Sequence, residues 1–141
     1  MRKVVKFGGS SLASAEQFRK VGEIIRADES RRYVVPSAPG KRFSADTKVT
    51  DLLYQCYQAA EKGGAEFQAL LSEIKSRYQE IIDGLELSIS LEEDFGLIEE
   101  NFKKQIGEEY AASRGEFLNG KVMADYLGFE FVDAARIIRF D

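Results

Sequence analysis

The chain has 141 residues, of which 44% are hydrophobic and 31% charged, and its formal net charge is −4. This composition can fill the core of one domain, or of a piece of a larger one, and it excludes a disordered polyelectrolyte. No dense block of lysine and arginine occurs, which argues against a nucleic acid or a membrane surface as partner. The sequence lacks histidine, so histidine catalysis and histidine metal ligands are excluded. Cys56 is the single cysteine, so an internal disulfide is impossible and a reducing compartment such as the cytoplasm fits.

The first third of the sequence predicts a strand, a glycine turn, a helix and a second strand. Residues 3–7 (KVVKF) have the composition of a short strand, and the two glycines that follow exclude a signal peptide or a transmembrane segment there. Residues 14–17 (SAEQ) have the form of a helix-capping box. The helix after it should bury one apolar face, made of Phe18, Val21, Ile24 and Ile25. Residues 33–35 (YVV) predict a buried strand, so the order is that of a βαβ unit with a parallel sheet, typical of an α/β fold.

The remaining sequence predicts mainly helices. Residues 36–40 (PSAPG) form a loop at a strand end, and the polar stretch 41–48 should be exposed and mobile. The predicted helices run from Thr50 to the glycine pair at 63–64, over 67–82, around 91–102, and over 118–127, with Gly128 as the last stop. Residues 129–134 (FEFVDA) alternate like a third strand. Three strands with several helices make half of a doubly wound sheet, so we expect the chain to be a fragment.

The glycine turn is the first candidate for chemistry. Residues 6–11 read KFGGSS, and glycines at a strand end allow backbone N–H groups to approach a phosphate. The helix that follows adds a positive dipole end, and Lys6 adds a full positive charge, as phosphoryl transfer requires. The spacing of a Walker A loop is absent. Taken alone, these residues are more often a plain tight turn with a surface lysine.

Three further positions have both a functional and a structural interpretation. Ser37 follows the second predicted strand, where open α/β sheets bind ligands, but Pro and Gly around it also suit a rigid turn. Thr50 and Asp51 could serve a ligand or cap a helix. Residues 113–116 (SRGE) match a capping box, and alternatively Glu116 could accept a hydrogen bond from an ammonium group.

Read in order, these four segments resemble the aspartokinases of the amino-acid kinase family. Residues 6–11 are similar to the K-F-G-G-[ST]-S opening of that family. Residues 34–38 (VVPSA) are similar to its V-V-x-S-A strand end, with Pro36 where a small or apolar residue is usual. Residues 48–53 (KVTDLL) resemble the threonine-containing start of the next helix, and residues 113–118 (SRGEFL) resemble the S-x-G-E-x-L segment. The resemblance covers essentially the whole chain.

The resemblance implies a parallel-sheet, three-layer α/β sandwich of the amino-acid kinase type, incomplete in this chain. Residues 1–141 would be the N-terminal, amino-acid-binding part of a catalytic domain. The implied reaction is ATP-dependent phosphorylation of the L-aspartate side chain to 4-phospho-L-aspartate, the first step towards lysine, threonine and methionine. The implied cofactors are ATP and Mg²⁺, the metal being held mainly through the nucleotide phosphates. The full-length enzyme would be a homo-oligomer.

The resemblance also implies roles for the phosphate-binding residues. Lys6 would be catalytic, because it would contact the phosphates and stabilise the transferring group. Gly8, Gly9 and Ser10 would donate their backbone N–H groups to the phosphates.

On the substrate side, Ser37 and Thr50 would hold aspartate, and Glu116 would bind its α-ammonium group. The nucleotide-binding segments and regulatory ACT domains of the family would lie beyond this chain, so the fragment alone should be inactive. Two alternatives stay open: a kinase for another acidic substrate such as glutamate, and a non-catalytic ligand-binding or interaction module built on the same half-fold.

Overall fold

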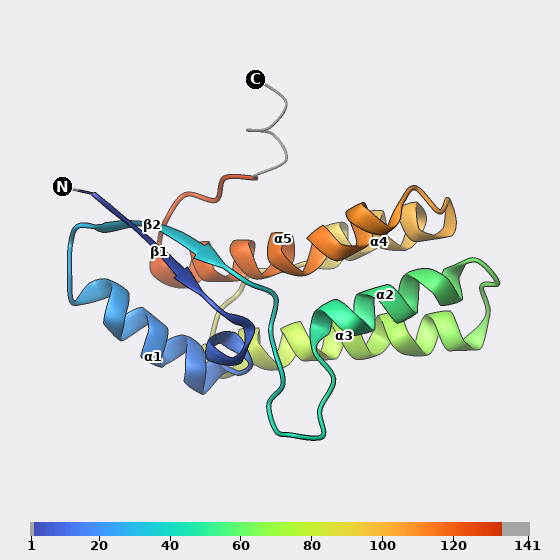
Figure 1. Ribbon diagram of the computed structural model, residues 1–141, viewed down its shortest axis with the longest axis horizontal. Coiled ribbons are helices and arrows are strands. Elements are labelled where there is room, and N and C mark those ends of the chain that lie inside the picture. The colour runs from blue at the N-terminus through green and yellow to red at the C-terminus, as the bar shows by residue number, and fades with distance from the viewer. Residues whose placement is uncertain (1, 134–141) are drawn as a thin grey trace.

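The computed structural model describes residues 2–133, the side chain of residue 32 excepted (Figure 1). Its elements are β1 (Lys3–Phe7), the short 3-10 helix η1 (Gly9–Leu12), α1 (Ala15–Arg26), β2 (Arg31–Pro36), α2 (Val49–Ala60), α3 (Ala65–Gly84), α4 (Glu92–Lys103) and α5 (Glu108–Leu127). The α/β class predicted from the sequence is confirmed. No helix in the described part of the chain is long and apolar enough to cross a membrane.

The two strands form a parallel pair, as the βαβ pattern predicts. Val5 lies opposite Val34 and Lys6 lies opposite Val35. Helix α1 connects the strands, and its predicted cap is present, since the Oγ of Ser14 accepts a hydrogen bond from the N–H of Gln17 at 3.4 Å. Because the strands are parallel, their carboxyl ends meet at one edge of the sheet. The glycine turn after β1 and the loop after β2 therefore lie side by side.

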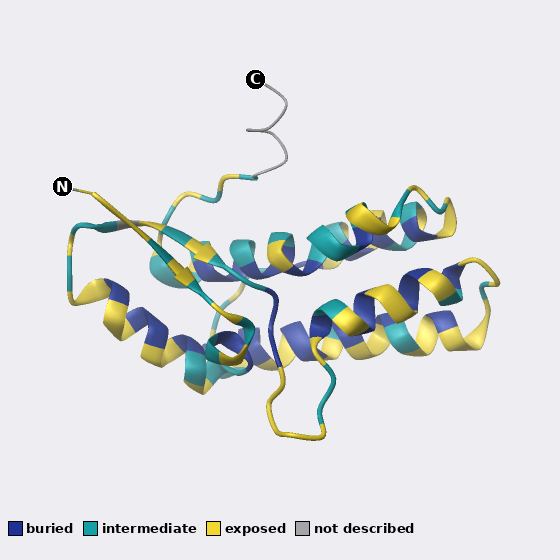
Figure 2. Cartoon of the chain, viewed as in Figure 1, coloured by how far each residue is buried: buried dark blue, intermediate teal, exposed yellow. Residues whose placement is uncertain are grey.

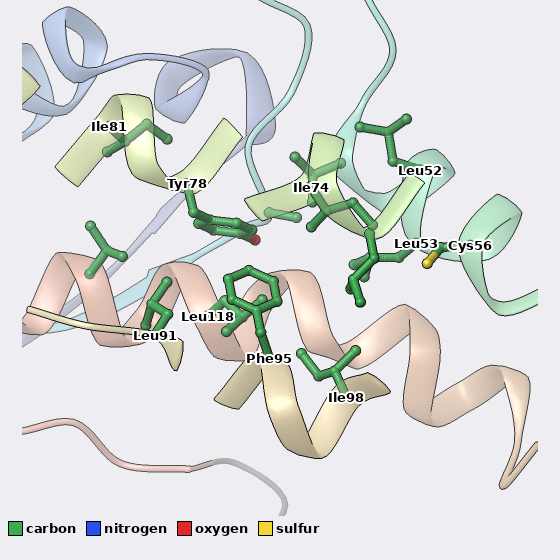
Figure 3. Close-up of a cluster of buried hydrophobic side chains, with 14 of the residues drawn as sticks. Leu52, Leu53, Cys56, Ile74, Tyr78, Ile81, Leu91, Phe95, Ile98 and Leu118 are labelled. Carbon is green, nitrogen blue, oxygen red and sulfur yellow. The ribbon is translucent and has the colours of Figure 1, made fainter. Parts of the chain in front are cut away.

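The core lies mainly among the helices, which pack alongside one another (Figures 1 and 2). Helix α2 packs against α3 and α5 and also contacts α4. Tyr78 of α3 is fully buried and its ring centroid lies 6.2 Å from that of Phe95 of α4 (Figure 3). Leu53, Ile98 and Leu118 are also buried in this cluster. Burial stabilises the fold by about 1.5–3 kcal/mol for each such side chain.

The expectation that β2 is a buried strand is wrong for one face of the sheet. Val4, Tyr33 and Val35 are exposed by 61%, 50% and 47%. Alternate residues of a strand point to opposite faces, and the described helices cover only the face that carries Phe7 and Val34. The prediction for α1 errs in one position, because Ile24 is 47% exposed while Phe18, Val21 and Ile25 are buried as expected.

The predicted strand at 129–134 is wrong over the part that the structure describes. The described residues 129–133 form no strand, and residue 134 lies outside the described range. Instead the ring of Phe131 stacks edge-to-face on Phe117 of α5, with 5.5 Å between centroids, and covers Gly120. The aromatic pair holds this segment on α5.

Helix α5 begins at Glu108, upstream of the SRGE segment at 113–116 that the sequence analysis interprets as its possible capping box. Its N-cap is Gly107, and Ser113 lies inside the helix, where its Oγ donates a hydrogen bond to the carbonyl oxygen of Tyr110. The capping-box interpretation of residues 113–116 is therefore wrong. The predicted stop is confirmed, because Gly128 takes the left-handed conformation with φ of 74°.

Candidate functional site

The loop after β2, residues 37–40, is the centre of the candidate site, and we call it the β2 loop. The N–H of Ser37, the first residue of the loop, donates to the carbonyl oxygen of Phe7 at 3.1 Å. The N–H of Gly40, the last residue of the loop, donates to the carbonyl oxygen of Gly9 at 2.8 Å. Two segments that the sequence analysis singled out separately are thus hydrogen-bonded to each other.

The contact between the β2 loop and the glycine turn leaves room for hydrogen only. A Cβ on Gly40 would lie 2.6 Å from the carbonyl carbon of Gly9, and a Cβ on Gly9 would lie 3.0 Å from the carbonyl oxygen of Ala38. A contact of 2.6 Å essentially never occurs at a real Cβ atom, so a larger residue at position 40 would push the two segments apart, and one at position 9 would require the loop to shift by a few tenths of an ångström. Close packing therefore requires glycine at position 40 and leaves little room at position 9.

The predicted phosphate-binding residues lie at the open side of this contact. Lys6, Gly8 and Ser10 are exposed, and the position of a Cβ on Gly8 is open space. The helix directly after the glycines is η1, a single 3-10 turn anchored by the fully buried Leu12. The sequence predicts a turn at residues 8–11 before the helix capped at Ser14, so the 3-10 helix, which has Gly9 and Ser10 at its start, was not expected.

The candidate substrate residue Thr50 lies in the first turn of α2. The N-cap of α2 is Lys48, so the interpretation of Thr50 and Asp51 as the cap is wrong. The N–H of Val49 donates to the carbonyl oxygen of Pro39 at 3.0 Å, which fixes the start of α2 on the β2 loop. Thr50 is half-buried beside this bond.

Glu116 follows Gly115, the residue of α5 that packs on the β2 loop. It is exposed, although the residue before it is packed tightly, since a Cβ on Gly115 would lie 2.6 Å from the Cβ of Ala38. The hydroxyl of Tyr78 donates to the carbonyl oxygen of Gly115 at 2.8 Å and holds this part of α5 in place. The structure therefore brings α5, α2 and the glycine turn together around the β2 loop.

Two buried polar residues that the sequence analysis missed also contact the β2 loop. The Nδ2 of Asn119 donates to the carbonyl oxygen of Ser37 at 2.7 Å. The guanidinium of Arg77 donates to the carbonyl oxygens of Gly40 at 2.5 Å and Thr47 at 2.7 Å. Burial lowers the pKa of Arg77 from its ordinary value. Both lie on apolar helix faces, and a polar residue at such a position is the signal that could have revealed them.

The polar stretch 41–48 is exposed over 41–45, as predicted. Ion pairs nevertheless tie it down: Nε of Arg42 lies 2.7 Å from Oδ2 of Asp46, and its Nη1 lies 2.8 Å from Oε2 of Glu80. The hydrogen bond from Arg42 holds the pKa of Asp46 well below its usual range. Asp46 in turn lies 3.6 Å from Arg77. These contacts restrict the mobility that the sequence predicts for this stretch.

Comparison with known proteins identifies the family. A sequence model described as the amino acid kinase family matches residues 1–139. The chain belongs to the amino acid kinase family. It is similar to aspartokinase 3 of Bacillus subtilis (strain 168), with 41% identity over 140 residues, which cover 94% of this chain and 30% of that relative.

Solved structures of the amino acid kinase family show the same likeness. The crystal structure of Clostridium acetobutylicum aspartate kinase is 45% identical with a TM-score of 0.87, over 94% of this chain and 30% of that one. Escherichia coli aspartokinase III in complex with aspartate and ADP has a TM-score of 0.68 over 91% of this chain and 29% of that one, and at 22% identity it supports the fold alone. The chain thus spans about 30% of the length of the relatives that it matches.

Other polar or reactive residues of this amino acid kinase chain lie outside the candidate site. Cys56 is buried on α2, and burial raises the pKa of its thiol to about 12 (Figure 3). Glu92, Glu93 and Asp94 begin α4, where negative charge interacts favourably with the helix dipole. A buried thiol with a raised pKa is not a reactive nucleophile, and the acidic run contributes to the start of α4.

Proposed function

We propose that the chain is the N-terminal, amino-acid-binding part of an aspartokinase catalytic domain. It would transfer the γ-phosphoryl group of ATP to the side-chain carboxylate of L-aspartate and form 4-phospho-L-aspartate, the first step towards lysine, threonine and methionine. The observation that carries the proposal is that one four-residue loop contacts the glycine turn, the start of α2 and the Gly115 region of α5. The 41% identity to aspartokinase 3 of Bacillus subtilis supports the choice of aspartate.

The phosphate half of the proposed site is the exposed edge after β1. Lys6 would neutralise charge on the transferring phosphoryl group, and the backbone N–H groups of Gly8, Gly9 and Ser10 would bind phosphate oxygens. The absence of side chains at both glycines allows a phosphate to approach the backbone closely. The packing of Gly9 on Gly40 would keep these donors in place before the nucleotide binds.

The aspartate half of the proposed site lies on the other side of the β2 loop. Ser37 and Thr50 would donate hydroxyl hydrogen bonds to the substrate. The exposed carboxylate of Glu116 would pair with the α-ammonium group, a charge-assisted contact that is stronger than a neutral hydrogen bond. Glu116 can take this role because it lies in the middle of α5 and does not cap a helix.

The reaction needs no general base, because an aspartate carboxylate is already ionised at neutral pH. One carboxylate oxygen attacks the γ-phosphorus in line and forms the new O–P bond. The bond between the γ-phosphorus and its bridging oxygen breaks, and ADP leaves with the electron pair. The chain contributes alignment of the two substrates and neutralisation of charge, so a chain without histidine is suited to this chemistry.

The proposed cofactor Mg²⁺ is compatible with the residues present. Residues 2–133 bring together no group of three or more acidic or cysteine side chains that could hold a metal ion, so the nucleotide phosphates would be its main ligands. When bound, Mg²⁺ supplies positive charge to the phosphate oxygens. We also propose a cytoplasmic enzyme, in which the buried free thiol of Cys56 stays reduced, and a homo-oligomeric full-length protein.

The test is an assay of the full-length enzyme with ATP, Mg²⁺ and a panel of amino acids. We expect ADP formation that depends on L-aspartate, and trapping of the product with hydroxylamine as a hydroxamate. ADP formation with glutamate in place of aspartate would identify a kinase for a different acidic substrate. Binding of ATP without turnover of any amino acid would identify a non-catalytic module and contradict the proposal.

A further inference from the structure

Two buried polar side chains from different helices reach opposite ends of the β2 loop. Asn119 of α5 is fully buried and binds the carbonyl oxygen of Ser37, the first residue of the loop. Arg77 of α3 is 2% exposed and binds the carbonyl oxygen of Gly40, the last residue of the loop. Between them, the carbonyl oxygen of Pro39 accepts the N–H of Val49. The backbone of the loop is thus held at three carbonyl groups.

Burying these two side chains costs stability. A charged guanidinium and an amide both lose hydration on burial, and the cost grows when a polar atom stays unpaired. Within the described residues, the Nε of Arg77 and the Oδ1 of Asn119 are buried without a hydrogen-bond partner. An apolar side chain at either position of these apolar helix faces would avoid that cost. An apolar side chain at either position would lose the hydrogen bond to the β2 loop, and at position 77 it would also lose the hydrogen bond to Thr47 and the ion pair with Asp46.

Each contact leads to a different half of the proposed site. Gly40 donates its N–H to Gly9 and packs directly against it, so Arg77 acts on the phosphate-binding turn through Gly40. Ser37 is a proposed contact of the amino-acid substrate, so Asn119 acts on the substrate half. Pro39 lies between the two ends of the β2 loop. Its ring is rigid and its carbonyl oxygen accepts the N–H of Val49, so a displacement at one end of the loop is not passed directly to the other.

We propose that Arg77 and Asn119 are positioning residues that set the two halves of the site separately, Arg77 the phosphate half and Asn119 the amino-acid half. This inference rests on the proposed aspartokinase function. Neither side chain would touch a substrate. Each would instead keep the groups that contact a substrate at the distance that phosphoryl transfer requires. A displacement of about 1 Å can already lower the rate by ~10²-fold.

The test uses the full-length enzyme and measures the KM for ATP and the KM for aspartate in each variant. Arg77→Met should lower kcat/KM for ATP by about 10- to 100-fold, with the KM for aspartate changed by less than about twofold. Arg77→Lys should lie between wild type and Arg77→Met, because an ammonium group can keep one of the two carbonyl contacts. Asn119→Leu should raise the KM for aspartate by about tenfold and leave the KM for ATP near its original value.

A matched control separates positioning from general destabilisation. The Nε2 of Gln105 also donates to two backbone carbonyls, those of Tyr57 and Phe102, far along α2 from the β2 loop. Gln105→Met should lower the melting temperature without changing either KM selectively. If Asn119→Leu does not fold, Asn119→Ser, which is smaller and keeps a donor, replaces it with the same expected direction.

Hydrogen exchange provides a readout that does not depend on turnover. The N–H of Gly40 is bonded to Gly9, so Arg77→Lys should speed exchange in the peptide that covers residues 37–49 while α4 stays protected as in wild type. The inference would be overturned if the KM for ATP and the KM for aspartate changed equally in the Arg77 and Asn119 variants. It would also be overturned if the melting temperature fell and neither KM changed. Lack of aspartate-dependent turnover in the wild-type enzyme would instead contradict the proposed function.

Discussion

Gly40 and Gly9 touch backbone to backbone, with the N–H of Gly40 bonded to the carbonyl oxygen of Gly9 at 2.8 Å. Gly40→Ala would place a methyl group 2.6 Å from the carbonyl carbon of Gly9. We expect the variant to lose about 1–3 kcal/mol of unfolding free energy, typical of overpacking, and to show a higher KM for ATP. Denaturant unfolding and steady-state kinetics of the full-length enzyme measure both effects.

A second glycine serves as the control for this prediction. A Cβ on Gly96 in α4 would point into open space. Gly96→Ala should therefore raise stability by up to about 1 kcal/mol, because alanine favours a helix interior, and should leave the kinetics unchanged. An unchanged KM for ATP in Gly40→Ala would show that the contact with Gly9 does not position the phosphate-binding turn.

Removal of the charge at Lys6 should affect the chemical step. Lys6 is exposed at the end of β1, beside the glycine turn. Lys6→Ala should lower kcat by roughly 10²–10³, the scale of losing one preorganised charge-stabilising donor. Because the side chain is exposed, the melting temperature should change little. Lys3→Ala, on the same strand, is the control and should keep kcat. A Lys6→Ala enzyme with near-normal kcat would remove Lys6 from the mechanism.

Loss of the charge on Glu116 should affect aspartate binding and leave stability unchanged. The side chain is exposed in the interior of α5, where it makes no contribution as a helix cap. Glu116→Gln should raise the KM for aspartate by about tenfold, the scale of one charge-assisted hydrogen bond, with the KM for ATP unchanged. The matched variant Glu109→Gln, in the first turn of α5, should leave both KM values unchanged. A lower melting temperature with an unchanged KM would contradict the proposed role.

The ion pair between Arg42 and Asp46 should make the stretch 41–48 sensitive to acid. The hydrogen bond from Arg42 lowers the pKa of Asp46 in the folded state. A lowered folded-state pKa contributes stability that is present above the unfolded value of about 3.9 and is lost as the pH falls below it. The melting temperature of Asp46→Asn should therefore be below that of wild type at pH 7, and the difference should shrink as the pH falls from about 5 to 3. The control is Asp125→Asn, which removes an exposed carboxylate outside this ion pair and should have the melting temperature of wild type at pH 7.

The 141-residue chain by itself should show no aspartate-dependent ADP formation. It spans about 30% of the length of the aspartokinases that it matches, and a half-site cannot align two substrates. Val4, Tyr33 and Val35 form an exposed apolar row on one face of the sheet, so the isolated chain should also self-associate. Circular dichroism establishes that the chain is folded before the assay. Turnover that Lys6→Ala abolishes would show that the site is complete within these residues.

The sequence predicts the local elements well and the contacts between distant ones poorly. The strand at β1, the cap at Ser14 and the stop at Gly128 depend on neighbouring residues, and all three are confirmed. The start of α5 was missed because SRGE at 113–116 matches a capping box, although the chain is already helical there. A local pattern cannot show that an upstream segment has its own reason to be helical.

The candidate site shows the same difference between local patterns, which the sequence predicts, and distant contacts, which it does not. Its predicted segments carry recognisable short motifs, and the structure brings them together around the β2 loop. Arg77 and Asn119 lie outside those motifs, because their partners are backbone carbonyls that have no sequence signature. Residues 129–133 alternate like a strand, but the fit of Phe131 on Phe117 outweighs that alternation. In each of these cases a contact between distant parts of the chain, and not the local sequence pattern, determines the structure.

The β2 loop also determines when the site can form during folding. Ser37 is bound by a residue 82 positions later in the chain, and Gly40 by one 37 positions later. Closing such long loops of chain is slow compared with forming a helix or a turn. During synthesis the glycine turn and the β2 loop leave the ribosome first, and α5 leaves last among the described helices. The proposed phosphate-binding geometry would therefore form once α3 has docked, and the proposed amino-acid half only once α5 has docked, at the end of folding and not at the beginning.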